Sequence, residues 1–156
     1  MTNIKKSILI DAPLEEVFDF MADVTNLPEI WPSMVEVKNV VDNEEERSFD
    51  WVYKMAGIRF EGHSVTTEFE QNKRVVTKSD KGIPATFTYS YARMGKGTQI
   101  TMETDYQIPN RVLSKLAEPI VRRINEREAI SLLNNLKDRM EFMAASYEGV
   151  EHPSIH

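Results

Sequence analysis

The feature that most constrains the fold of this chain is an alternating pattern that extends from Met34 to Pro109. Large apolar or aromatic side chains take every second position in several segments, for example from Phe49 to Met55. Such alternation is typical of antiparallel strands with one buried face and one face in solvent. Turns separate the segments and leave no room for parallel crossovers of about a dozen residues each. The pattern therefore predicts six strands joined largely as hairpins.

Other periodicities flank this region. Residues 3–10 are predicted to form a further strand, and two short helices are expected between it and Trp31-Pro32. Residues 110–146 contain no glycine and a single proline, Pro119, and are predicted to be helical. Pro119 should kink or break this segment, because its ring clashes with the preceding turn. The predicted fold class is α+β, of the helix-grip kind. In it a curved, seven-stranded antiparallel sheet wraps around a long C-terminal helix, with two short helices after the first strand.

The apolar positions of the C-terminal segment change phase along its length. An earlier stripe comprises Leu113, Leu116, Ala117, Ile120 and Ile124, and a later one comprises Ala129, Leu132, Leu133, Leu136, Met140 and Met143. The two are displaced by roughly a third of a turn when residues are placed about 100° apart. The later half is expected to pack as core against the sheet, while the earlier part faces something else.

A cavity is expected between the sheet and this helix. A helix only about 10 Å wide cannot fill the concave side of a strongly curved sheet. The inward strand positions are large and aromatic, and many carry hydroxyls that need partners when buried. The alternative is that these aromatics are ordinary core. The residues predicted to contact a ligand are Trp51, Tyr53, Phe60, Phe87, Tyr89, Tyr91, Met102, Tyr106, Leu113, Leu116, Ile120 and Ile124.

Few residues are candidates for chemistry. His63, two positions from Glu61, could act as a general acid or base, but an ordinary strand histidine is the simpler interpretation, and no catalytic residue is assigned. Arg127 and Glu128 continue the earlier stripe, so either could anchor a polar group of a ligand; an exposed ion-pair face is the alternative. Trp31-Pro32 is either a lid over the cavity or a plug in the core. The histidines show no metal-ligand spacing, so neither a metal nor another cofactor is predicted.

Composition limits the classes of function. The chain has no cysteine, which excludes disulfides and thiolate metal sites. Its 19 basic and 25 acidic residues give a formal net charge of −6, which disfavours nucleic-acid binding. No apolar run is long enough for a secretory signal or a membrane span. We therefore expect a cytoplasmic protein without nucleic-acid partners or integral membrane association.

Three stretches resemble a known family. They are residues 8–20 (ILIDAPLEEVFDF), residues 27–40 (LPEIWPSMVEVKNV) and the closing LLNNLKDRME. The chain resembles the START-like, helix-grip (SRPBCC) superfamily, and most closely its polyketide cyclase/dehydrase and lipid-transport group. The resemblance implies a single START-like ligand-binding domain over residues 1–146, and residues 147–156 are predicted to be a flexible tail. Members bind lipids, quinones, hormones or polyketides, and some are enzymes or partner-binding modules, so no catalytic motif is transferred.

Three functional hypotheses remain open. The first is binding or carrying a small hydrophobic molecule, such as a lipid, a quinone or a polyketide-like ring system, in the internal cavity. The second is a cyclase/aromatase or dehydratase that uses the same pocket, with a tyrosine or His63 moving protons. The third is a protein-interaction module, against which the mostly polar outer strand positions argue. The ligand's identity and the oligomeric state are left open.

Overall fold

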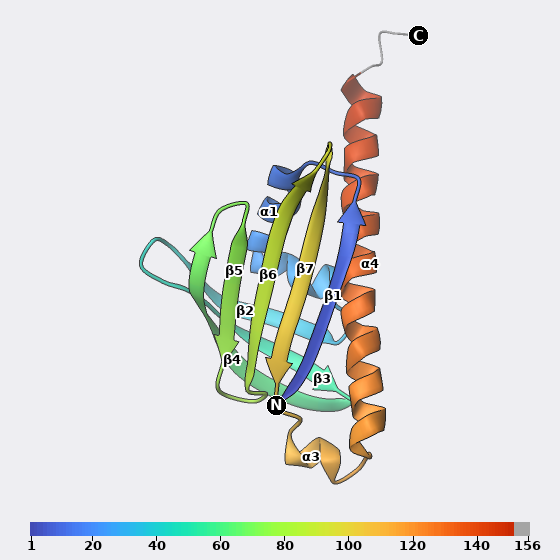
Figure 1. Cartoon of the computed structure of the whole chain (residues 1–156). Coiled ribbons are helices and arrows are strands. Elements are labelled where there is room, and N and C mark those ends of the chain that lie inside the picture. Colours follow the sequence, from blue (N-terminus) through green and yellow to red (C-terminus); the bar gives the residue numbers. More distant parts are fainter. Residues whose placement is uncertain (152–156) are drawn as a thin grey trace.

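One curved sheet of seven antiparallel strands forms the framework of the protein (Figure 1). The computed structural model describes residues 1–151, with side chains described as far as Ser146. The order across the sheet is β1-β7-β6-β5-β4-β3-β2, so hairpins join β2 through β7 and β1 closes against β7. The strands are β1 (Thr2–Ile10), β2 (Met34–Asp42), β3 (Arg47–Met55), β4 (Ile58–Glu70), β5 (Arg74–Ser79), β6 (Ala85–Met94) and β7 (Gly97–Tyr106). The predicted six-strand hairpin region and the strand before it are confirmed.

Short helices follow β1, and a long helix follows the sheet. The helices are α1 (Leu14–Ala22), the 3-10 turn η1 (Val24–Asn26), α2 (Leu27–Ile30), α3 (Asn110–Leu113) and α4 (Glu118–Glu151). In Figure 1, α4 runs beside β1 along the height of the sheet and continues beyond it. This arrangement confirms the α+β, helix-grip fold class.

The helical region after β7 is interrupted at residues 114–117, where the sequence pattern predicts continuous helix. Pro119 is the second residue of α4, a first-turn position at which its missing N–H removes no intrahelical hydrogen bond. The break predicted at Pro119 is thus the start of a new helix. α4 runs on to Glu151, past the predicted domain limit at residue 146. Of the predicted flexible tail 147–156, residues 152–156 lie outside the described residues.

α4 has one continuous buried stripe, not the two that the sequence pattern predicts. The residues of this stripe are Val121, Asn125, Ala129, Leu132, Leu133, Leu136 and Met140. The predicted earlier stripe is largely outside the core, since Leu113 is 40% exposed and Ile120 is 49% exposed. The later half packs as core and the earlier part faces away from it, as predicted, but the buried stripe of α4 starts before the predicted later stripe, for two reasons. The helix restarts at Pro119 and loses the phase of the preceding residues, and the polar Asn125 takes a buried position that apolar periodicity does not mark.

Aromatic side chains brace the concave face of the sheet at two places along β6. Phe18 of α1 packs edge-on against Tyr91, with ring centroids 5.0 Å apart. Trp31, the residue after α2, packs edge-on against Phe87, with centroids 5.4 Å apart. Phe87 and Tyr91 are four positions apart along the strand, which is roughly 13 Å. The space between sheet and helices extends past Phe87, as far as Ala85 and Tyr106.

Candidate functional site

A cavity of about 160 Å³ lies between the concave face of the sheet and α4. Strands β3 to β7, the region from α1 to α2, and α4 all contribute to its wall. Seven of the predicted ligand-contacting residues line it, namely Trp51, Tyr53, Phe87, Tyr89, Tyr91, Met102 and Tyr106. Their side chains point into the fold rather than to bulk solvent, although their contact with a ligand stays a prediction.

Five predicted residues do not line the cavity: Phe60, Leu113, Leu116, Ile120 and Ile124. Phe60 is buried, but the guanidinium of Arg111 in α3 lies 4.9 Å from its ring centroid, so Phe60 packs under α3 instead. The other four lie in α3, in the break after it or on the outward side of the first turns of α4. The residues that α4 contributes to the wall are Asn125, Glu128, Ala129 and Leu132.

One part of the wall carries polar groups of Trp31, Tyr53 and Glu128, with Ser33 next to them, and we call these four residues the Glu128 cluster. Glu128 Oε1 accepts a hydrogen bond from the backbone N–H of Ser33, with 2.6 Å between nitrogen and oxygen. Burial raises the pKa of the Tyr53 phenol, and the nearby Glu128 carboxylate raises it further. The neighbouring hydrogen-bonding side chains of Trp31 and Ser33 lower this pKa. The ring of Trp31 lies edge-on to that of Tyr53, with centroids 5.5 Å apart. Although it is near Tyr53, Nε1 of Trp31 is buried without a partner in hydrogen-bonding geometry among the described residues.

A second polar pair on the wall joins the sheet to α4. Asn125 Nδ2 donates to the hydroxyl of Tyr106 at 2.8 Å, and both side chains are buried. Burial raises the pKa of Tyr106, while the hydrogen bond from Asn125 acts in the opposite direction. Beside Tyr106 on the same face of β7, the hydroxyl of Thr104 is buried without a partner among the described residues. The wall is therefore apolar overall but holds unused hydrogen-bonding capacity.

The remaining tyrosines of the wall are protonated hydroxyl donors. Burial raises the pKa of Tyr89, and burial together with its neighbour Tyr89 raises the pKa of Tyr91. A phenol with a raised pKa stays neutral near pH 7, so it can donate a hydrogen bond but is a poor base. The indole N–H of Trp51 is occupied, since it donates to Ser64 Oγ at 2.9 Å.

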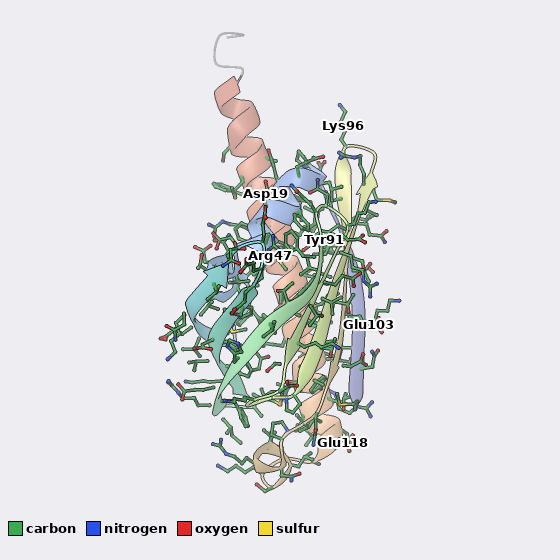
Figure 2. All side chains as sticks on the ribbon, turned by 90° about the vertical axis from the view of Figure 1, so that its left-hand side faces the viewer. Asp19, Arg47, Tyr91, Lys96, Glu103 and Glu118 are labelled. Atoms are coloured by element: carbon green, nitrogen blue, oxygen red, sulfur yellow. The ribbon has the colours of Figure 1, made fainter. Side chains whose placement is uncertain are left out.

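The cavity has a partly exposed rim formed by the turn after α1 and the β2–β3 hairpin. The rim residues are Ala22, Asp23, Val24, Val40, Val41, Asp42 and Arg47. The alternation of buried and exposed side chains in β2 stops here, because its pairing with β3 shifts in register between Lys38 and Val41. Val41 is 37% exposed. Arg47 forms an ion pair with Asp42, with Nε 3.3 Å from Oδ1, and its guanidinium carbon lies 3.8 Å from the ring centroid of Phe69. Figure 2 shows Arg47 and Tyr91 in the half of the domain that contains Asp19 of α1.

His63 lies away from the cavity. It is exposed, and its Nδ1 is 2.7 Å from Asp50 Oδ1 on the outer face of the sheet. Hydrogen bonds from Asn39 and from His63 lower the pKa of Asp50. His63 is therefore not placed to act on a molecule inside the cavity. Of the two polar α4 candidates, Glu128 lines the cavity, whereas Arg127 is exposed and does not.

The described residues offer no obvious metal site or membrane-spanning element. No group of three or more His, Cys, Asp or Glu side chains within them is arranged to hold a metal ion. None of their helices combines the length and apolar character needed to cross a bilayer. Inside the rim, the polar groups of the cavity wall are hydroxyls, the indole N–H groups of Trp31 and Trp51, the Asn125 amide and the Glu128 carboxylate.

Comparison with known proteins gives a family and a common fold. Residues 1–141 match the family described as polyketide cyclase / dehydrase and lipid transport. The protein TTHA0849 of Thermus thermophilus is similar in structure, with a TM-score of 0.79 at 20% identity over 93% of this chain and 99% of that one. A START superfamily protein of Mycobacterium smegmatis gives 0.74 at 14% identity, over 90% and 98% of the two chains.

An enzyme is also among the similar structures. The aromatase/cyclase Zhui of a Streptomyces species gives a TM-score of 0.70 at 14% identity, over 90% of this chain and 93% of that one. At these identities the likeness shows a shared fold and leaves the activity of this chain open. No curated protein matches the chain.

Proposed function

The chain belongs to the polyketide cyclase / dehydrase and lipid transport family, and we propose that it binds and carries a small apolar molecule in the cavity between the sheet and α4. The observation that carries this proposal is the cavity itself, whose wall is mainly aromatic and aliphatic. Apolar cavities stay dry and take up apolar guests: an engineered one of about 150 Å³ binds benzene. A cytoplasmic location remains part of the proposal.

The cavity volume limits the size of the guest in this conformation. About 160 Å³ matches a molecule of roughly one substituted ring, by the same comparison with benzene. A long-chain lipid or a multi-ring polyketide would have to displace the rim formed by the β2–β3 hairpin. We therefore favour a single-ring or similarly compact guest over a two-chain lipid.

A cyclase-type or dehydratase-type enzyme is the second candidate, and one observation favours it. Glu128 is an ionisable group on the cavity wall, close enough to Tyr53 to raise the pKa of that phenol. A carboxylate base beside a protonated hydroxyl could move a proton on a bound substrate. The replacement of Glu128 by Gln keeps the shape, so it should abolish turnover and spare binding if this candidate is correct.

Filling the cavity tests the binding proposal. Ala129 lines the wall from α4 and is 5% exposed, so Ala129→Leu places three extra carbons in the guest's space. We expect this variant to bind propylbenzene at least tenfold more weakly than the parent, by calorimetry, while it unfolds at the same temperature or higher. Ala145→Leu, at an exposed position of the same helix, is the matched control and should bind normally. Equal binding by Ala129→Leu and the parent would contradict the proposal.

A further inference from the structure

We propose that the cavity selects a ring that carries a hydroxyl group, a phenol, whose oxygen accepts a hydrogen bond from Trp31 and donates one to Glu128. This inference rests on the proposed function, since it names the class of guest for the same cavity. It follows from the hydrogen-bonding groups that the Glu128 cluster leaves unused.

The indole of Trp31 needs an acceptor. Trp31 is 8% exposed and lines the cavity, and its Nε1 is near the Tyr53 hydroxyl but has no partner in hydrogen-bonding geometry among the described residues. An indole N–H can only donate, and a buried donor without a partner is unfavourable. A guest that presents an oxygen at this position removes that penalty, whereas a hydrocarbon leaves it in place.

Glu128 needs a donor at the same end of the cavity. Its Oε1 already accepts from the backbone N–H of Ser33, and a carboxylate has further lone pairs to offer. The Glu128 carboxylate acts on the Tyr53 phenol, and Trp31 packs 5.5 Å from Tyr53 between centroids, so Trp31 and Glu128 border one corner of the cavity. A single guest atom in that corner must accept from an N–H and donate to a carboxylate. A hydroxyl does both, whereas an ether only accepts.

The surroundings favour an aromatic and neutral guest. Trp31, Tyr53 and Phe87 form edge-to-face pairs around this corner, and Phe87 stacks on Tyr89 with an interplanar angle of 10°. A flat ring fits such a wall better than a bulky aliphatic alcohol does. Arg47 is the sole basic side chain among the described lining residues, and it lies at the rim, paired with Asp42. A guest with a carboxylate would meet Glu128 without a cation to offset the repulsion.

The chain provides an internal reference for the experiment. It has two tryptophans, Trp31 and Trp51, and both line the cavity. The Trp51 N–H already donates to Ser64, whereas that of Trp31 is unpartnered. The two indole N–H signals of the ¹⁵N-labelled full chain, assigned with Trp31→Phe and Trp51→Phe, therefore report separately on a new hydrogen bond.

The probes are 4-propylphenol, 4-propylanisole, propylbenzene and 4-propylbenzoate, each titrated by calorimetry and by NMR. We expect the phenol to bind about tenfold more tightly than the anisole and the hydrocarbon, because only the phenol donates a hydrogen bond to the charged Glu128. The benzoate should bind most weakly, because its carboxylate is repelled by Glu128. The Trp31 N–H signal should move downfield with the phenol, by more than the Trp51 signal. Glu128→Gln should remove most of the preference for the phenol, measured as the ratio of the phenol and propylbenzene affinities of the same variant. Asp138→Asn, the same change at an exposed position of α4, should alter neither.

The outcomes separate this inference from the proposed function. If propylbenzene binds as tightly as the phenol, or if the Trp31 signal stays in place while the phenol binds, the hydroxyl selection is wrong and the cavity remains a binding site. If none of the four probes binds, the proposed function fails and the selection fails with it.

Discussion

The contact between Gly62 and Trp51 gives a sharp test of how the cavity wall is built. The two residues face each other on β4 and β3, and the Trp51 ring lies directly over the glycine. A Cβ at position 62 would lie 2.1 Å from Cζ2 of Trp51 and 2.5 Å from the carbonyl oxygen of Lys81. Real Cβ atoms do not approach other atoms so closely, so Gly62→Ala must displace the indole or the strand.

The size of the effect can be worked out from these contacts. Overpacking costs about 1–3 kcal/mol. A displaced indole also loses its hydrogen bond to Ser64, worth about 1 kcal/mol. We therefore expect Gly62→Ala to lower the free energy of unfolding by roughly 2–4 kcal/mol in urea denaturation. In a Trp51→Phe background most of the clash with the ring is absent, so the same substitution should cost at least about 1 kcal/mol less, as a double-mutant cycle measures. A cost below about 0.5 kcal/mol, or an equal cost in both backgrounds, would refute this packing.

Three further outcomes can be checked independently. Asn125→Ala leaves the Tyr106 hydroxyl without its donor, so the free energy of unfolding should fall by about 1–3 kcal/mol in chemical denaturation. His63→Gln should leave propylbenzene affinity unchanged but raise the pKa of Asp50, followed by carboxyl NMR, towards its ordinary value. Because the folded-state pKa of Asp50 is lowered, its stabilising contribution is lost as pH falls through that lowered value, and His63→Gln should shift this loss to higher pH. Tyr91→Phe should not change the phenolate absorbance that develops below about pH 11, because burial keeps Tyr91 protonated there.

The sheet could be predicted from sequence because its signal is local. In β7, the buried Ile100, Met102, Thr104 and Tyr106 alternate with half-buried residues, and hairpin turns lie between such segments. Where a strand has one face in the core and the other in solvent, burial and periodicity coincide. In β3 the agreement is weaker, because Ser48 and Val52, which alternate with the inward-facing aromatic residues, are buried as well.

The contribution of the helix to the site could not be predicted in the same way. Periodicity finds buried positions only where they are apolar, and α4 uses Asn125 and Glu128 on its cavity side. Both are held by partners distant in the sequence, Tyr106 and the backbone of Ser33, which no local pattern reveals. Glu128 was a candidate for the wrong reason, since it was grouped with a stripe that proved to be largely exposed. The burial of Trp31 against Phe87 likewise depends on tertiary packing.

The central claim is that side chains leave an unfilled apolar space between the sheet and α4. Crystals of the protein under xenon pressure test it directly, because xenon enters apolar cavities of this size. The account predicts a xenon peak inside the cavity, in contact with Tyr89, Met102 and Leu132. A structure in which these side chains close on one another and no xenon enters would contradict it.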